Sequence, residues 1–317
     1  MDKKVCKNIL NKIKKAKIIT IYGHVNPDCD CYGSSLALRE IIRDNFKNKK
    51  VYALGFGPTM LFDRLTRYDT DVTDEEIKES LAIIVDVSET ERVSEPRVTL
   101  AKDLLKIDHH IESVPFDHLK WVDTGSIAAC QMIAEFAFTF HLKVSKLAAE
   151  LLYLGICTDS GRFRYAPTNA KTHLIVSKLY ELGIEPKSMF DILYQSEARY
   201  VKYQALIVSK FKTTKNNVIY CFIDPEDYEQ FGLKFDQVSK NVNVMGNIIG
   251  AKAWTLFTRS PEGFIRVEFR SSGKNIQPVA AKYGGGGHKC AAGARLENYT
   301  WKDCMKIVND LDKVVSE

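Results

Sequence analysis

Short apolar runs alternate with amphipathic stretches through the first half of the chain. Residues 4–16 carry apolar side chains at helical spacing, which predicts a helix with one buried face. Unbroken apolar runs predict strands at 17–22, 51–54, 81–85 and 104–107. An unbroken run of this kind is typical of a strand that is covered on both faces. Strands that alternate with helices predict an α/β fold with a doubly wound, mainly parallel sheet.

Helical patterns fill the segments between and after these strands. We expect Ser34 or Ser35 to cap a helix that runs through Ile42. The residues from His24 to Asp30 would then form a loop between a strand and that helix. Further helices are expected at about 124–140, 144–155 and 169–182.

The second half of the chain has a different pattern. A long helical stretch at 186–210 begins with a proline, and we interpret it as a connector between domains. Strands are expected at 217–223, 248–257 and 264–270, the last with strict alternation of buried and exposed positions. A short helix at about 275–283 precedes a run of four glycines. The patterns predict an N-terminal catalytic domain (1–185), a helical connector (186–211) and a smaller C-terminal α/β domain with a mixed sheet (212–317).

The composition indicates a mildly basic protein and a reducing compartment. The 317 residues include 45 basic and 40 acidic ones, so the net charge of +5 would favour polyanionic substrates. The eight cysteines contain no C-x-x-C pair, although Cys29 and Cys31 flank Asp30. No apolar run approaches the roughly 18 residues of a membrane span. We therefore expect a cytoplasmic protein with reduced thiols and no membrane partner.

Acidic and imidazole residues follow several of the predicted strands. Asp86 follows one strand directly, and the triplet 108–110 (Asp-His-His) follows another. Because ligands bind at the carboxyl ends of the strands in open α/β sheets, we expect these side chains to converge. Mixed imidazole and carboxylate groups suit two divalent ions, manganese above all with iron or cobalt as alternatives, better than a closed zinc site. The candidate metal ligands are His24, Asp28, Asp30, Asp86, His109 and Asp159.

A second group of candidate residues, suited to binding an anion, lies in the C-terminal half. Glycines 284–287 would let the backbone approach a ligand closely and present N–H groups to an anion, with His288 as a further donor. Arg270 and Ser271 end the preceding strand, and Arg270 could bring a guanidinium to the same anion. A flexible turn and a surface salt bridge are the alternative interpretations.

Taken together, these residues resemble the DHH phosphoesterase superfamily, in the branch with a C-terminal DHH-associated domain. Residues 24–34, Asp86, 108–110 and 155–163 are similar to the four motifs of the catalytic domain. Residues 284–293 are similar to the glycine-rich signature of the associated domain. Several ordered motifs over nearly the whole chain make the resemblance specific.

The resemblance implies two metal ions that share one carboxylate. His24, Asp28 and Asp86 would hold the first ion, and Asp86 would bridge to the second. The other ligands of the second ion would be Asp30, His109 and Asp159.

The resemblance also implies catalytic and substrate-binding residues. His110 would lie near the phosphate or the leaving group, and Asp108 would orient an imidazole. Whether His109 or His110 is the direct metal ligand stays open. The substrate would be bound across an interdomain cleft by Arg270, Ser271, Gly285, Gly286, Gly287 and His288.

The function implied by the resemblance is metal-dependent hydrolysis of short oligoribonucleotides (nanoRNA) and of adenosine 3′,5′-bisphosphate. One alternative is cleavage of cyclic di-adenylate or its linear dinucleotide. Others are inorganic pyrophosphatase activity and a nucleotide sensor without catalysis. The apolar helix at 126–140 is either simple core or the face of a homodimer.

Overall fold

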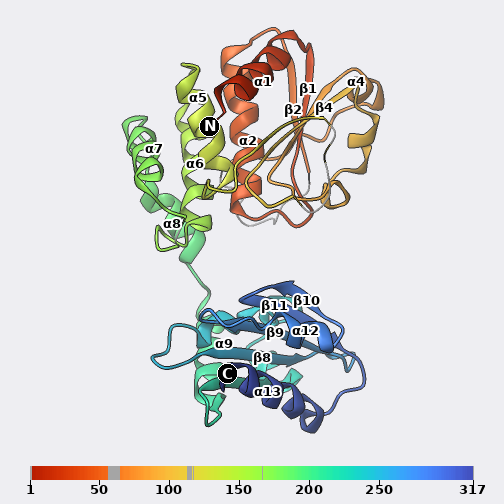
Figure 1. Ribbon diagram of the computed structural model, residues 1–317, viewed down its shortest axis with the longest axis vertical. Helices are drawn as coiled ribbons and strands as arrows, with labels where there is room; N and C mark the ends of the chain where they lie inside the picture. The colour runs from red at the N-terminus through yellow and green to blue at the C-terminus, as the bar shows by residue number, and fades with distance from the viewer. Residues whose placement is uncertain (1, 56–64, 113–115, 117, 166, 317) are drawn as a thin grey trace. The chain divides into compact units, whose positions relative to one another are not determined.

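The structure is a computed structural model that describes residues 2–55, 65–112, 116, 118–165 and 167–316. The chain forms two compact units, Met1–Gln195 and Ser196–Glu317 (Figure 1). The stretch 186–210, expected to be one long helix, contains two: α8 (Pro186–Tyr194) and α9 (Ala198–Lys210). None of the helices in the described ranges is long and apolar enough to cross a membrane.

The first unit contains a parallel five-stranded sheet in the order β2-β1-β3-β4-β5. The mainly parallel α/β sheet predicted from the sequence is confirmed, and β5 is a strand that the sequence patterns did not reveal. All five residues of β3 are buried, as expected for a strand covered on both faces. The strands are β1 (Ile18–Tyr22), β2 (Lys50–Leu54), β3 (Leu81–Val85), β4 (Asp103–Asp108) and β5 (Leu119–Val122).

Long helices cover one face of this sheet. Apolar side chains of β1, β3 and β4 pack there against α1, α2, α5 and α6, while the short helix α4 and 3₁₀ turns cover the other face. Helix α5, considered as a dimer face, has eight buried residues and belongs to the core. The helices are α1 (Lys3–Lys15), α2 (Cys29–Asn45), α4 (Asp74–Lys78), α5 (Ala129–Thr139), α6 (Lys146–Asp159) and α7 (Ala170–Glu181), followed by α8.

Helix α2 begins earlier than the sequence suggested. Asp28 is its N-cap, because its side chain accepts hydrogen bonds from the amides of Asp30 and Cys31. The predicted caps, Ser34 and Ser35, lie inside the helix, where their hydroxyls donate back to the Cys31 carbonyl. The expected start was therefore wrong by about one and a half turns.

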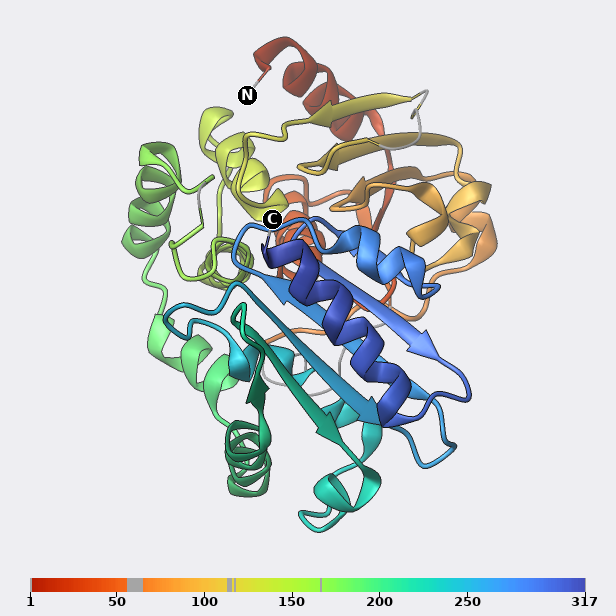
Figure 2. The ribbon, with the colours of Figure 1, turned by 60° about the horizontal axis from the view of Figure 1, so that its bottom comes forward.

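The second unit contains a mixed six-stranded sheet in the order β10-β11-β9-β8-β7-β6 (Figure 2), as predicted for the C-terminal part of the chain. Only β7 and β8 pair in parallel. The strands are β6 (Lys212–Thr213), β7 (Val218–Ile223), β8 (Ala253–Arg259), β9 (Ile265–Ser271), β10 (Gly286–His288) and β11 (Ala291–Leu296). The helices of this unit are α9, α10 (Pro225–Glu229), α11 (Phe235–Val238), α12 (Gln277–Lys282) and α13 (Trp301–Ser316).

Two cores lie on opposite faces of this sheet. Val267 and Phe269 of β9 pack with α12 and α13, whereas Leu256 of β8 packs with Tyr203 and Ile207 of α9. Helix α9 thus contributes to the core of the second unit. The alternation predicted for β9 is confirmed, but β8 begins five residues later than expected because 248–252 form a turn.

Two glycines allow α2 and α6 to pack closely. A Cβ at Gly33 would lie 2.4 Å from the Leu151 carbonyl oxygen. A Cβ at Gly155 would lie 2.4 Å from Cys130 Sγ and 2.7 Å from Asp30 Oδ1. Only a residue without a side chain fits where α2, α5 and α6 meet.

Substitution of Gly155 by alanine should therefore destabilise the protein. Overpacking costs about 1–3 kcal/mol, against the ~1 kcal/mol that alanine gains over glycine in a helix. The melting temperature should fall, and divalent metal binding should weaken because Asp30 is displaced. Gly125→Ala is the control, since its nearest new neighbour is Asp123 Oδ1 at 3.4 Å. Equal melting temperatures for the two variants would contradict the packing argument.

Candidate metal centre

The N-terminus of α2 presents two aspartates in different ways. Asp28 Oδ1 accepts the amides of Asp30 and Cys31, both at 3.0 Å, and its Oδ2 lies 3.8 Å from His24 Nε2. Asp30 is fully buried, although the sequence suggested that it lies on a loop. Its two carboxylate oxygens accept the first amides of α5, from Ala129 at 2.7 Å and from the following residue at 2.9 Å. A helix N-terminus stabilises a carboxylate, so these bonds fix the position of the Asp30 side chain and partly offset the cost of burying its charge.

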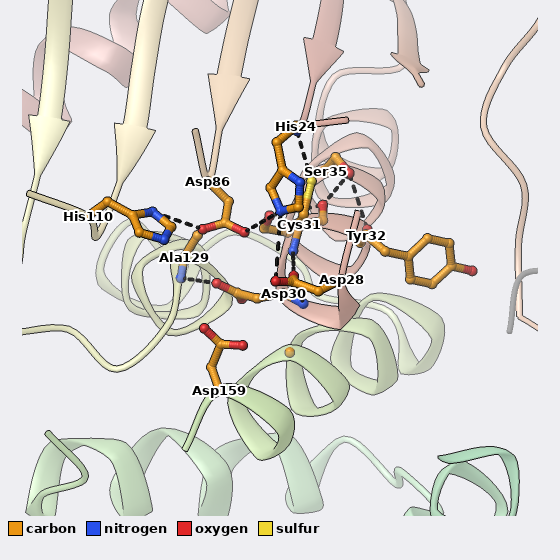
Figure 3. A network of polar contacts seen from close by, with 12 residues as sticks. His24, Asp28, Asp30, Cys31, Tyr32, Ser35, Asp86, His110, Ala129 and Asp159 are labelled. Atoms are coloured by element: carbon orange, nitrogen blue, oxygen red, sulfur yellow. Dashed lines mark hydrogen bonds and ion pairs between the residues drawn. The ribbon is translucent and has the colours of Figure 1, made fainter. Parts of the chain in front are cut away.

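Asp86 lies at the centre of the site, directly after β3 (Figure 3). Its φ of 57° places it in the left-handed region, where a non-glycine residue costs about 1–3 kcal/mol and is common at functional sites. Its Oδ2 lies 3.8 Å from His24 Nε2, and its Oδ1 lies 3.3 Å from His109 Nε2. Asp86 Oδ1 is buried and has no hydrogen-bond partner in the described part of the chain.

Three carboxylates surround one nitrogen of His109. Its Nε2 lies 3.6 Å from Asp30 Oδ2, 3.3 Å from Asp86 Oδ1 and 3.6 Å from Asp159 Oδ2. Its Nδ1 lies 3.3 Å from the carbonyl oxygen of Ser126, which can only accept, so Nδ1 carries the hydrogen. Nε2 therefore turns a lone pair toward three acidic side chains.

His24 repeats this arrangement on the other side of Asp86. Its Nδ1 donates to the carbonyl oxygen of Val25 at 2.8 Å, which leaves the lone pair on Nε2. That nitrogen faces Asp28 and Asp86. A ring nitrogen that faces carboxylates is stabilised by a proton or by a metal ion between them; although burial opposes it, the hydrogen bond to Asp28 raises the pKa of His24. Both groups have the ligand types of a divalent metal site.

Because the acidic groups are buried and close together, their pKa values shift. Burial, followed by the charges of Asp30 and Asp28, raises the pKa of Asp86 well above its ordinary value. Burial and the same neighbours raise the pKa of Asp159 to about 9. Burial also raises the pKa of Asp30. A divalent cation would reverse these shifts, because it stabilises the charged form of each carboxylate.

The residues present fit two metal ions. One group, within 4.8 Å, combines Asp30, His109 and Asp159, and another combines Asp86 with His109 and His110. On the other side of the site, His24 and Asp86 group with a residue that sequence reasoning did not propose as a ligand, the buried Cys31. All six candidate ligands predicted from the sequence thus come together around Asp86. Their roles as ligands remain a prediction.

The structure separates the two adjacent histidines. His109 faces the carboxylates, whereas His110 is 44% exposed and donates from Nδ1 to Asp108 Oδ1 at 2.8 Å. Asp108 is fully buried, and its hydrogen bond to Nδ1 means that it orients His110 rather than His109. Lys106, a residue the sequence reasoning missed, lies 3.5 Å from Asp108 Oδ2 and 3.3 Å from Glu112. In the sequence, Lys106 could have been recognised because it is a lysine inside an otherwise apolar strand.

The second half of the glycine-rich run, Gly286 and Gly287, forms an exposed edge strand with His288, β10, while Gly284 lies in the turn that precedes it. His288 pairs with Ala291 of β11, which pairs with Arg270 of β9, so the three residues share one row and one face of the sheet. The Arg270 guanidinium donates to Glu268 Oε2 at 3.3 Å and to the Phe269 carbonyl at 2.8 Å, so the salt bridge considered as the alternative for this residue is present. Ser271 is buried, and its hydroxyl donates to the Lys274 carbonyl at 2.5 Å.

Two glycines of this run lie against the neighbouring strand. A Cβ at Gly285 would lie 2.1 Å from the Gly293 carbonyl oxygen, and one at Gly287 would lie 2.6 Å from the Ala291 carbonyl oxygen. The φ of 136° at Gly287 also excludes ordinary residues. Gly286, by contrast, has open space around its Cα.

Comparisons with known proteins agree with this geometry. The DHH family, N-terminal domain, matches residues 18–156, and the DHHA1 domain matches residues 207–317. The bifunctional oligoribonuclease and PAP phosphatase NrnA of Bacillus subtilis (strain 168) is 34% identical over 314 residues, 98% of each chain. The protein of the same name from Mycoplasma genitalium is 35% identical over 312 residues, 96% of each chain.

A solved structure shares the fold. An exopolyphosphatase-related protein from Bacteroides fragilis superposes with a TM-score of 0.87 at 22% identity, over 99% of this chain and 98% of the other. The chain belongs to the DHH family, in the branch that carries a DHHA1 domain. The family and the phosphoesterase class predicted from the motifs are confirmed.

Metal-free protein should lose thermal stability as the pH rises from about 6 to about 9. The pKa of Asp159 is about 9 in the folded chain and about 4 in the unfolded chain, so only the folded chain holds this proton between those values. The stability that this proton brings is lost as the pH approaches the folded-state pKa. Melting curves in chelator should show a smaller decline for Asp159→Asn, and an equal decline would contradict the assignment.

The two histidines should differ in metal binding. His109→Ala should weaken one of two manganese binding events by more than roughly 100-fold, because its Nε2 would be a direct ligand. His110→Ala should change both by less than about tenfold, because Nδ1, the nitrogen that lies 3.6 Å from Asp86, carries the hydrogen that it donates to Asp108. Isothermal titration of both variants measures this. Equal losses of manganese affinity in the two variants would show that the inward position of His109 does not identify it as the metal ligand.

Proposed function

We propose that the protein is a metal-dependent phosphoesterase that hydrolyses short oligoribonucleotides and removes the 3′-phosphate from adenosine 3′,5′-bisphosphate. The observation that carries the proposal is the set of three carboxylates around the lone pair of His109. The substrate class follows from relatives that are 34% and 35% identical over nearly the full chain and are named for these two activities.

Two divalent ions would be held on either side of Asp86. We assign His24, Asp28 and Asp86 to one ion and Asp30, Asp86, His109 and Asp159 to the other, with manganese as the proposed metal. Bound there, the ions would supply a water of lowered pKa and neutralise phosphoryl charge. Imidazole and carboxylate ligands support manganese, iron or cobalt over a closed zinc site.

The chain's own residues would orient the substrate and handle a proton. Asp108 holds the Nδ1–H of His110, which leaves Nε2 of this half-exposed ring free to hydrogen-bond a phosphate or leaving oxygen. In the second unit, Arg270 and His288 share one face with Ala291 between them, a geometry suited to an anion. Gly286, which has open space around its Cα, would let a ligand approach the backbone of β10 closely, while Gly287 lets β10 lie against β11.

We also propose the cytoplasm as the compartment. All eight cysteines are free thiols, which agrees with a reducing environment.

The test is manganese-dependent hydrolysis of four substrates in parallel: an RNA dinucleotide, a short RNA oligomer, adenosine 3′,5′-bisphosphate and cyclic di-adenylate. The linear RNAs and the bisphosphate should be preferred. Asp86→Asn should lower the rate by more than roughly 100-fold, since it removes the carboxylate common to both ions. The control is Asp71→Asn, at an exposed carboxylate of the same unit, which should retain full activity.

Each other outcome has a defined meaning. A folded Asp86→Asn protein with full activity would exclude a two-metal centre at Asp86. Turnover of the cyclic compound alone would indicate a signalling phosphodiesterase. Metal binding without turnover of any of the four would favour a pyrophosphatase or a sensor, and pyrophosphate hydrolysis would distinguish those two.

A further inference from the structure

The segment directly after Asp159 has an unusual backbone. Gly161, Arg162 and Phe163 have φ values of 55°, 63° and 63°, so three consecutive residues lie in the left-handed region. For the two non-glycine residues this conformation is strained, and such strain persists where surrounding contacts hold it. The strained segment begins two residues after a candidate metal ligand (Figure 3).

Hydrogen bonds to the end of α6 hold this segment in place. The Arg162 amide donates to the Cys157 carbonyl at 2.8 Å, and the Phe163 amide donates to Ser160 Oγ at 2.9 Å. The amides of Arg164 and Tyr165 both donate to the Ser160 carbonyl, at 2.9 and 3.0 Å. The backbone groups are thus used internally, and the side chains of residues 162, 164 and 165 point into solvent.

Tyr165 presents one face of its ring. The other face lies over Gly161, where a Cβ would be 2.4–2.7 Å from three ring carbons. A residue with a side chain at 161 would lift the ring from this position. The Tyr165 side chain is nevertheless 55% exposed. A rigidly backed aromatic ring with a free face is the platform on which single-stranded nucleic acids stack their bases.

Two arginines belong to the same segment as this ring. Arg162 and Arg164 are exposed, and neither forms an ion pair with any residue that the structure describes. The Arg162 guanidinium lies 5.2 Å from the ring centre of Tyr194, which is itself 46% exposed. Arg164 Nε donates to the Gly161 carbonyl at 2.9 Å. Cations beside an acidic metal centre offset the repulsion that four carboxylates exert on a polyanionic substrate.

We propose that Tyr165 is the stacking surface for one base next to the scissile phosphate, and that Arg162 and Arg164 attract the phosphates of the same short oligonucleotide. This inference deepens the proposed function and rests on it. Stacking would act equally in the bound substrate and in the transition state, so Tyr165 is a positioning residue that affects KM more than kcat.

The test pairs a substitution in the protein with a deletion in the substrate. Wild type, Tyr165→Ala, Tyr165→Phe and the control Tyr180→Ala, at another half-exposed tyrosine, are assayed with manganese on an RNA dinucleotide. The same enzymes are assayed on two analogues, each with one abasic nucleotide. Loss of one stacked base costs roughly 5- to 150-fold in binding. Tyr165→Ala should raise KM for the dinucleotide by that factor, and Tyr165→Phe and Tyr180→Ala should match wild type.

The abasic analogues separate stacking from a structural effect. The penalty of Tyr165→Ala should disappear on the analogue that lacks the stacked base and remain on the other. A penalty that persists on both analogues, or a loss of manganese affinity in isothermal titration, would overturn the proposal, because the substitution would then act through Asp159. Unchanged kinetics of Tyr165→Ala on an intact dinucleotide would overturn it too. Failure of wild type on every RNA would instead refute the proposed function.

The variant Arg162→Gln tests independently whether the arginine binds a phosphate. If Arg162 binds a phosphate, the variant should raise KM equally for the intact dinucleotide and both abasic analogues. The slope of log KM against log salt concentration should fall by roughly 0.7 for each phosphate that the variant no longer neutralises, as for single strands. If the increase in KM caused by Arg162→Gln depended on the presence of a base, the guanidinium would not act on a phosphate alone. That result would contradict the proposal that the ring binds a base and the guanidinium binds a phosphate.

Discussion

Repulsion between carboxylates is the constraint on which the first unit depends. Four aspartates and two imidazole lone pairs face one another around Asp86, and no cationic side chain of the described chain lies among them. The fold tolerates this arrangement because hydrogen bonds fix four of these six groups. Two amides of α5 hold Asp30, two amides of α2 hold Asp28, and carbonyl oxygens hold the two imidazoles. The result is a preorganised cavity for positive charge.

Much of this arrangement could be predicted from local sequence patterns. An apolar run with a polar residue at its end marks a strand, and the carboxyl ends of parallel strands share one edge. That argument alone placed Asp86 and the triplet 108–110 at this edge, where β3 and β4 end. The sequence also proposed His24, Asp28, Asp30 and Asp159 as ligands, from their positions at the ends of other elements, and the structure brings them to the same point.

Other features depend on contacts between segments that are distant in sequence. The position of Asp30 depends on amides 99 and 100 residues away, which no local pattern reveals. Adjacent histidines look alike in a sequence, and only the Ser126 carbonyl and the Asp108 carboxylate distinguish His109 from His110. The start of α2 was misjudged because serine and aspartate are both good caps, and the serines are needed inside the helix.

The chain order of the ligands has a consequence for protein synthesis. The candidate ligands come from several separate segments, and the last of them, Asp159, is also the last residue of α6. A ribosome must therefore release about half of the chain before the site can be complete. A nascent or truncated chain that lacks α6 also lacks the helix that packs on α2 through Gly155. Hydrolytic capacity would thus not arise before α6 has been synthesised, so a shorter nascent chain could not cleave RNA.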